Sequence, residues 1–288
     1  MSAIAQNQPQ PGMFTEAASR LRSSWLLSSR AGIVSSVMVL VTIVVVAAGP
    51  LLVPYGLDTQ GPDAFAGASG SHLLGTDEVG RDLLSRLTYA VRLDMLIALA
   101  AIPIGGMIGT LLGLTGVLSP RLGQITARLF DVIIGFPTLV LGIAIALVMT
   151  PGTSAVIVAI AVVNVPIFGR LARGGMLSQL GRDYVLAARS LGASRWRILR
   201  RHVLPNIRSA LLVQSAIAIA DAVFIEGALS ILGVGVQAPN ASLGSIVQAG
   251  LPYIADSPLY VLAPTFALAW VILGFALMAD TFNARITR

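Results

Sequence analysis

Residues 132–169 read VIIGFPTLVLGIAIALVMTPGTSAVIVAIAVVNVPIFG, a run of 38 residues without one charged side chain. A single straight helix of that length, at about 1.5 Å per residue, would be nearly twice as long as the roughly 30 Å hydrocarbon core of a bilayer. The chain must therefore fold back within this run. Residues 150–153, Thr-Pro-Gly-Thr, lie in its middle and predict the turn, because proline lacks the helical N–H and glycine tolerates positive φ. The run predicts two membrane crossings, at 127–149 and 154–172.

The overall composition agrees with a membrane protein. Of the 288 residues, 56% are hydrophobic and 11% are charged, and the mean hydropathy is +0.85. Soluble domains carry about 25% charged residues, so this chain could not cover a water-facing surface with the charges it has. We expect an all-α integral membrane protein.

Other long intervals between charged residues locate the remaining crossings, because a charge at the centre of a span costs about 2.5–3.5 kcal/mol in insertion experiments. These crossings are predicted at 32–53, 93–116, about 209–233 and about 259–280, which makes six in all. A secretory signal peptide is the alternative for the first, but that apolar run begins only after Arg30 and exceeds the about 7–15 residues of such a signal. The chain then divides into an N-terminal segment 1–30, a first crossing with an outer segment 31–92, a five-helix core 93–280 and a tail 281–288.

Glycines crowd the second predicted crossing. Gly105 and Gly109 are spaced as a small-residue motif, in which the missing side chains let two helix backbones approach each other. We expect close packing of another helix at this point.

Three residue types that carry much enzyme chemistry are absent or scarce. The 19 basic residues are all arginine, there is no cysteine, and the only histidines are His72 and His202. Without lysine the chain cannot form a nucleotide-hydrolysing P-loop or a Schiff base. Without cysteine it has no thiol catalysis, disulfide or cysteine metal site. We expect no metal, cofactor or ATP site in this chain, and a function that depends on movement.

The arginines are distributed unequally between the two sides of the predicted membrane. With both termini inside, 16 of the 19 lie in cytoplasmic segments, and only Arg81, Arg86 and Arg92 lie outside. Cytoplasmic loops of membrane proteins carry an excess of basic residues. Both termini are therefore predicted to be cytoplasmic.

Two outer segments follow from this topology. The first contains Asp77, Glu78 and Asp82, whose spacing differs from that of a calcium-binding EF-hand loop, so we expect a solvated helix start held by salt bridges. The second, residues 233–258, is rich in Gly, Pro and Ser without apolar periodicity, and predicts a folded loop near the membrane surface.

The inner segment 171–208 is the longest cytoplasmic connection and carries eight arginines. Apolar residues recur near every 3.6 positions within 184–191 and again within 196–203, with Gly192 between the two stretches. This pattern predicts two short helices joined by a glycine corner and lying parallel to the membrane, the second of them ended by Pro205. An arginine-rich helix resting on anionic lipid is the alternative interpretation.

Residues 183–206 resemble the signature loop of binding-protein-dependent ABC importer permeases. In that family the loop reads Glu-Ala-Ala, three residues, Gly, nine residues, Ile, one residue, Leu-Pro. The matching positions hold Ala187, Ala188, Gly192, Leu204 and Pro205. Leu186 replaces the glutamate, which removes any polar contact that glutamate would make. His202 stands where the broad pattern has isoleucine, as it often does in the peptide-importer branch.

Three further stretches resemble the C-type permease of dipeptide, oligopeptide and nickel importers. They are residues 48–55, residues 74–84, and residues 226–239 together with Gly244 and Ser245. With the signature loop they cover the chain from about residue 23 to residue 280. The resemblance implies a multi-pass permease subunit of a bacterial inner membrane that forms half of a pathway for di- or oligopeptides, with nickel or glutathione as alternative cargoes.

The same resemblance implies partners and a mechanism. A second homologous permease, two ATP-binding subunits and an extracytoplasmic substrate-binding protein complete the importer within the membrane lipid; ATP and Mg²⁺ stay on the ATP-binding subunits, and no nucleic acid is involved. A cytoplasmic coupling helix between the fourth and fifth crossings would fit a groove on an ATPase, so that closure of the ATPases moves the bundle between inward-open and outward-open states. The residues implied in coupling are Leu186, Ala187, Ala188, Gly192, Ala193, Ser194, Arg195, Trp196, Arg197, Ile198, Leu204 and Pro205. Within this set Gly192 is expected to make the close turn and 193–198 the ATPase contact, with a lipid anchor as the alternative for Trp196.

Four polar residues within the predicted crossings are candidates for the translocation pathway or its gate, namely Asn164, Gln214, Asp221 and Glu226. Ionisable residues in spans usually face the bundle interior or water, because exposure to lipid is costly. Gln214 and Asp221 are seven positions apart and share a helix face. Asp221 can attract a positively charged peptide terminus or pair with an arginine of the partner permease, whereas Glu226 is expected to fix the outer loop or gate.

Two other classes of protein compete with the importer subunit. A self-contained secondary transporter would show an internal repeat with helices broken near mid-membrane, and the sequence has no convincing repeat. An intramembrane enzyme would need a nucleophile with a base, or a metal cluster, inside the spans, and neither histidine lies in one. The permease is therefore the favoured interpretation.

Overall fold

The computed structural model of the chain describes residues 29–286. Most of the predicted N-terminal segment, up to residue 28, and residues 287 and 288 lie outside the described residues. The described part is helical and has no strand, only an isolated bridge between Thr76 and Asp82. The prediction of an all-α protein is confirmed.

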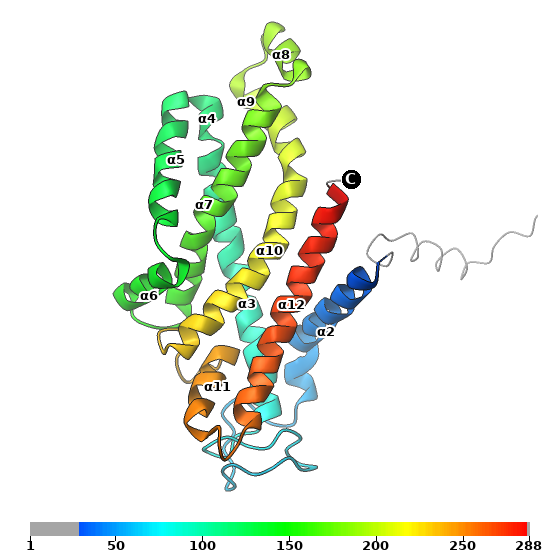
Figure 1. The fold of residues 1–288 in the computed structure, drawn as a ribbon, viewed down its shortest axis with the longest axis vertical. Coiled ribbons are helices and arrows are strands. Elements are labelled where there is room, and N and C mark those ends of the chain that lie inside the picture. The colour runs from blue at the N-terminus through cyan, green and yellow to red at the C-terminus, as the bar shows by residue number, and fades with distance from the viewer. Residues whose placement is uncertain (1–28, 287–288) are drawn as a thin grey trace, which may run out of the picture.

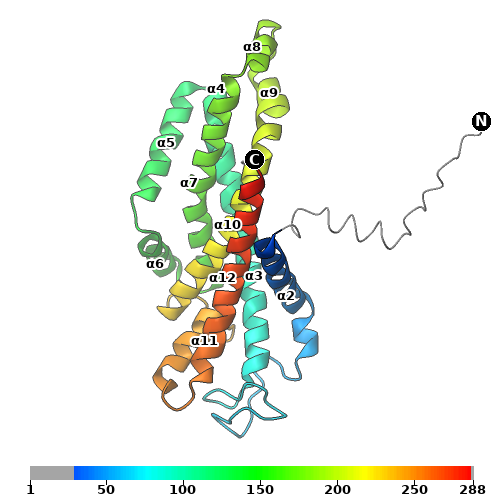
Figure 2. The ribbon, with the colours of Figure 1, turned by 45° about the vertical axis from the view of Figure 1, so that its right-hand side comes forward.

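Long helices run through the described part of the molecule, and shorter helices connect them (Figure 1). The long helices are α2 (Arg30–Leu52), α3 (Leu83–Gly113), α7 (Thr153–Leu180), α10 (Leu204–Ile231) and α12 (Leu259–Ile286). The shorter ones are α4 (Thr115–Leu118), α5 (Pro120–Ile134), α6 (Thr138–Met149), α8 (Asp183–Ser190), α9 (Arg195–Ile198), the π-helical turn η2 (Leu199–Val203), α11 (Leu243–Gly250) and the 3₁₀ turn η3 (Leu251–Tyr253). The segment 53–82 and α11 lie at one end of the bundle and α8 lies at the other, as both views show (Figures 1 and 2).

Each long helix is long and apolar enough to cross a membrane, and α5 with α6 makes a sixth crossing when the pair is counted as one span. Five of the predicted crossings coincide with the long helices. Four of these helices extend beyond the prediction at one end: α3 begins at Leu83 instead of 93 and α10 at Leu204 instead of about 209, while α7 continues to Leu180 instead of 172 and α12 to Ile286 instead of about 280. The early start of α3 has a local cause: Asp82 caps the helix by accepting a hydrogen bond from Ser85 N at 2.8 Å.

The third crossing differs from the straight helix predicted at 127–149. α5 and α6 meet at an angle of 91°, with the break at residues 135–137, Gly-Phe-Pro. Pro137 has no N–H for a helical hydrogen bond and disfavours the helical conformation in the residue before it, so the first helix ends there. The fold-back predicted at 150–153 is confirmed, since α6 ends and α7 begins on either side of it.

The core of the bundle is built on a close crossing of α3 and α7. Gly109 faces the backbone of α7 so closely that an added Cβ would lie 2.2 Å from the carbonyl oxygen of Val165, and Gly105 and Gly113 make equally close approaches. Only glycine permits this separation, so the packing predicted from Gly105 and Gly109 is confirmed. Helices α2, α10 and α12 pack around this pair and share one apolar core with it.

The segment before α3 is held by buried ion pairs. Asp77 is fully buried, and its Oδ2 accepts hydrogen bonds from Arg81 Nε at 2.6 Å and from Arg86 Nη1 at 2.8 Å. The predicted salt bridges are present, but the expectation that they are solvated is wrong. The preceding loop folds over them, with Phe65 N donating to Asp77 O at 3.1 Å. Within residues 29–286 no cluster of three or more acidic or histidine side chains could hold a metal ion.

The segment 233–258 is more regular than predicted. It contains α11, which begins with a capping box between Ser242 and Ser245 and packs against α10 and α12. Eight residues are too few for apolar periodicity to stand out from a Gly- and Ser-rich background, which is why the sequence predicted a loop here.

Candidate functional site

The predicted glycine corner is present. α8, a tight turn and α9 together form a corner segment, residues 183–198, in which Gly192 takes a left-handed φ of +80°. Two backbone hydrogen bonds close the turn: Gly192 N donates to Arg189 O and Ala193 N donates to Ala188 O, both at 2.9 Å. A Cβ at position 192 would meet no atom within 4 Å, so glycine is required by the backbone conformation and not by crowding.

The chain beyond the corner segment departs from the prediction, because Pro205 does not end a helix. α9, η2 and α10 form one continuous helix of 37 residues from Arg195 to Ile231. Pro205 lies in the first turn of α10, directly after the wider π-helical turn. Because Pro205 lies inside the continuous helix, its missing N–H removes one helical hydrogen bond. The regular α-helical pattern is already interrupted by the wider turn directly before it, in which Leu204 N donates to Leu199 O.

A small apolar core joins the corner segment to the bundle. Its buried members are Leu114, Val117, Ala172, Met176, Val185, Ile198, Leu199, Val203 and Ile207. Arg195 adds a hydrogen bond to the carbonyl oxygen of Leu118. The prediction that Ile198 belongs to the contact surface is wrong, because its side chain is only 2% exposed. Ile198 instead supports the corner segment from within.

The corner segment also presents large apolar side chains to its surroundings. Leu191 is 89% exposed, Trp196 is 61% exposed and Leu186 is 47% exposed. Side chains of this kind are usually buried, and several exposed ones on one short segment mark an interaction surface. Of the other predicted coupling residues, Ala187, Ser194, Arg195, Arg197 and Pro205 are exposed, whereas Ala188, Ala193 and Leu204 are partly buried.

Among the pathway candidates, the structure brings Asn164 and Asp221 together. Both line a cavity of about 270 Å³ between α6, α7 and α10. Asn164 is 1% exposed; its Nδ2 donates to Ile160 O at 2.9 Å, and its Oδ1 has no hydrogen-bond partner among residues 29–286. Gln214 lies two turns away on α10 and does not line this cavity.

Glu226 is buried in the core and is connected to the outer loop. Its Oε1 accepts from Ser230 Oγ at 2.6 Å, and Ser230 Oγ in turn accepts from Val236 N at 3.0 Å. Asp94 of α3 meets Glu226 there, and its Oδ2 accepts from Leu243 N of α11 at 3.2 Å. In the sequence Asp94 marks only the end of a charge-free interval, and no spacing relates it to Glu226, so this part of the site was missed.

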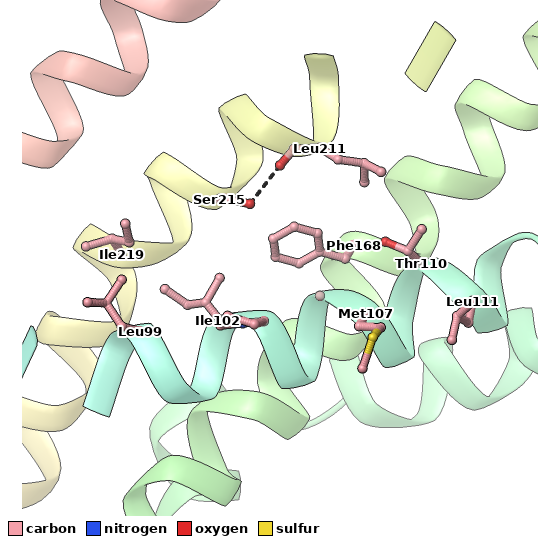
Figure 3. A pocket seen from close by; sticks show the side chains of 11 residues that line it. Leu99, Ile102, Met107, Thr110, Leu111, Phe168, Leu211, Ser215 and Ile219 are labelled. Carbon is pink, nitrogen blue, oxygen red and sulfur yellow. Dashed lines mark hydrogen bonds between the residues drawn. The ribbon is translucent and has the colours of Figure 1, made fainter. Parts of the chain in front are cut away.

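A second cavity, of about 410 Å³, lies between α3, α7 and α10 (Figure 3). Leu99, Phe168 and Ile219 are among the side chains that line it, and Ser215 donates its hydroxyl hydrogen to Leu211 O at 2.9 Å. None of the residues that line this cavity is charged. It therefore offers apolar contact, whereas the smaller cavity offers polar groups.

Comparisons with known proteins agree with one another. Residues 94–288 match the family described as binding-protein-dependent transport system inner membrane component. The chain is 32% identical over 278 residues to the dipeptide transport system permease protein DppC of Alkalihalophilus pseudofirmus, which covers 95% of this chain and 91% of that protein. It is 34% identical to the glutathione transport system permease protein GsiD of Pectobacterium atrosepticum, over 74% of this chain and 71% of that protein.

A solved structure has a similar fold. A chain of the inward-facing MetNI methionine ABC transporter superposes with a TM-score of 0.54 and 19% sequence identity, over 70% of this chain and 94% of that chain. At this identity the likeness concerns the fold.

Proposed function

Because the chain belongs to the family of binding-protein-dependent transport system inner membrane components, we propose that it forms one half of the transmembrane pathway of an ATP-driven importer of di- and oligopeptides. It is a multi-pass protein of the bacterial inner membrane. The observation that carries the proposal is the corner segment, an apolar projection with its own small core, attached directly to a 37-residue helix. A chain without lysine has no P-loop, so the movement is driven from another polypeptide.

The importer in this proposal contains a second homologous permease, two ATP-binding subunits and an extracytoplasmic substrate-binding protein. ATP and Mg²⁺ are bound by the ATP-binding subunits. The corner segment faces the cytoplasm, as do both termini, in agreement with the distribution of arginines. Segment 53–82 and α11, at the other end of the bundle, then face the binding protein.

The long helix supports a mechanical link between the two ends. It carries the corner segment at its start, Asp221 further along and Glu226 near its outer end. A displacement of the corner by an ATPase therefore moves the walls of the polar cavity and the support of the outer loop together. Movement of this kind is what alternating access between an inward-open and an outward-open state requires.

Within the corner segment the residues have different proposed roles. Gly192 sets the angle between α8 and α9, because only glycine adopts its φ without strain. Leu186, Leu191 and Trp196 provide the apolar contact with the ATPase. Ile198 anchors the segment to the bundle, so that a force on the contact surface reaches α10.

Peptides are the proposed cargo because a dipeptide permease is among the relatives of this chain. A glutathione permease is also among them, which makes glutathione the second candidate. Nickel chelates follow as a third. Peptides and glutathione both carry a free amino group, which polar side chains such as those that line the cavity beside Asn164 and Asp221 can bind.

Reconstitution of the chain in proteoliposomes with the products of its neighbouring genes tests the proposal. We expect ATP-dependent uptake of di-, tri- or longer peptides, with glutathione and nickel chelates offered in parallel. Uptake that continues without the ATP-binding subunits would indicate a self-contained transporter and contradict the proposal. Tight binding of a metal complex by the cognate binding protein, without binding of any peptide, would overturn the cargo assignment.

A further inference from the structure

Asn164, which lines the polar cavity between α6, α7 and α10, has a hydrogen-bond acceptor that nothing in the described part of the chain uses. Asn164 Oδ1 is buried without a partner, and the cavity that Asn164 lines also presents Thr138 of α6 and Asp221 of α10. Leaving a buried carbonyl oxygen without a donor costs about 1–3 kcal/mol. A position that tolerates this cost is suited to a donor that arrives from outside the chain.

Asp221 also lines this cavity, and its carboxylate has no ion-pair partner among the described residues. It lies ten residues before the end of α10, which at about 1.5 Å per residue is about halfway through a hydrocarbon core of about 30 Å. Its side chain is exposed, and none of the ion pairs among residues 29–286 includes it. Because a carboxylate at this depth does not face lipid, its exposed side must face the pathway or a partner.

We propose that this cavity is a subsite for the protonated amine of the cargo, with Asp221 supplying the negative charge and Asn164 Oδ1 and the Thr138 hydroxyl oxygen supplying further acceptors. An ammonium group has three N–H donors, which matches three acceptors on three helices. Phe224 also lines the cavity, and aromatic rings attract cations. The inference rests on the proposed function, because it places the cavity on the translocation pathway.

The dimensions of the cavity limit what it holds. A volume of about 270 Å³ is smaller than the roughly 300–1,000 Å³ of sites that enclose a whole drug-sized ligand. The cavity therefore suits one end of a peptide, and leaves the rest of the cargo in the larger passage between the two permeases. Such a subsite selects for a free amino group and not for a particular sequence.

Binding to the importer in nanodiscs, without nucleotide and without the binding protein, tests the subsite. The probes are alanyl-alanine and N-acetyl-alanyl-alanine, which differ in the charge at the amino end. We expect the free amine to bind about tenfold more tightly or better, as a charge-assisted hydrogen bond predicts. Asp221→Asn should bring the two affinities close together, whereas Asp221→Glu should keep the preference.

Two further variants distinguish a binding role from a structural one. Asn164→Leu removes the unpaired oxygen together with the hydrogen bond from Nδ2 to Ile160 O. Binding of the free amine should fall in this variant, and thermal unfolding measured beside it reports any loss of stability. Asp131→Asn is the matched control, because Asp131 is an exposed carboxylate paired with Arg170 at 2.6 Å and does not line the cavity. Its binding preference should equal that of the wild type.

Three results would decide against the subsite. An Asp221→Asn importer that keeps the tenfold preference would overturn it. Dissociation of the two permease subunits in that variant, with the preference unchanged, would mean that an arginine of the partner permease holds Asp221. Equal binding of both probes by a wild-type importer that takes up peptides with ATP would refute the subsite and leave the proposed function standing, whereas absence of any ATP-driven uptake would refute the function itself.

Discussion

Replacement of Gly192 by alanine should uncouple ATP hydrolysis from transport. Gly192 has a φ of +80°, and the space around its Cα is open, so the added methyl group meets no neighbour. The effect of the substitution is therefore confined to the backbone, where an L-residue in the left-handed region costs about 1–2 kcal/mol. The variant should still insert in the membrane, because the corner segment lies outside the apolar core of the bundle.

The expected size of the effect follows from the hydrogen bonds that close the turn. Two backbone hydrogen bonds hold it, each at 2.9 Å, and a typical intramolecular hydrogen bond contributes about 0.5–1.5 kcal/mol net. The strain from alanine is thus comparable with the free energy of the hydrogen bonds that close the turn. It shifts the equilibrium between the closed and the open turn toward the open form by about 5–30-fold. Valine, whose branched Cβ is still less compatible with positive φ, should disrupt the turn further.

The assay is the ratio of peptide taken up to ATP hydrolysed in proteoliposomes. We expect this ratio to fall for Gly192→Ala and to fall further for Gly192→Val. Gly181→Ala is the matched control, because Gly181 flanks the other end of α8 with a φ of −85° and has similarly open surroundings. Wild-type coupling in the Gly192→Val importer, or equal loss of coupling in Gly181→Ala, would refute the reasoning.

Three further substitutions test separate parts of the structure. Gly109→Ala should lower the free energy of unfolding of the purified protein by about 1–3 kcal/mol, because its Cβ would lie 2.2 Å from a backbone oxygen of α7. Gly174→Ala is the control and should not lower it, because the added Cβ would have nothing within 4 Å. Trp196→Ala should weaken co-purification of the ATP-binding subunits by about tenfold or more; unchanged co-purification would favour a lipid anchor. Ser230→Ala removes the hydroxyl that donates to Oε1 of buried Glu226 and that accepts from Val236 N. It should cost about 1–3 kcal/mol and speed proteolysis of the outer loop; unaltered thermal unfolding would remove Ser230 from that role.

The sequence predicted the features that depend on local chemistry. A charge-free run must be buried in lipid or protein, so the crossings could be located, and the turn at 150–153 followed from one proline and one glycine. Gly192 could be assigned to a corner because it lies between two stretches in which apolar residues recur with helical spacing. The close packing of another helix at Gly105 and Gly109 followed from their spacing, and the structure identifies that helix as α7.

Features that depend on distant contacts could not be predicted in this way. The meeting of Asp94 with Glu226 joins helices that no sequence spacing relates. The cavity shared by Asn164 and Asp221 depends on how α6 is turned by the break before it. The continuous helix through Pro205 depends on a π-helical turn, which the spacing of the apolar residues does not reveal.

Cross-linking from the corner segment tests the central claim most directly. The chain has no cysteine and no lysine, so a thiol-to-amine reagent attached at Leu191→Cys has only the N-terminal amine to react with in its own chain or in a second copy. In the reconstituted importer we predict a cross-link from Leu191→Cys to an ATP-binding subunit, and none from Ser257→Cys, which lies near α11 at the other end of the bundle. Cross-linking of the ATP-binding subunit from position 257 and not from position 191 would contradict the account.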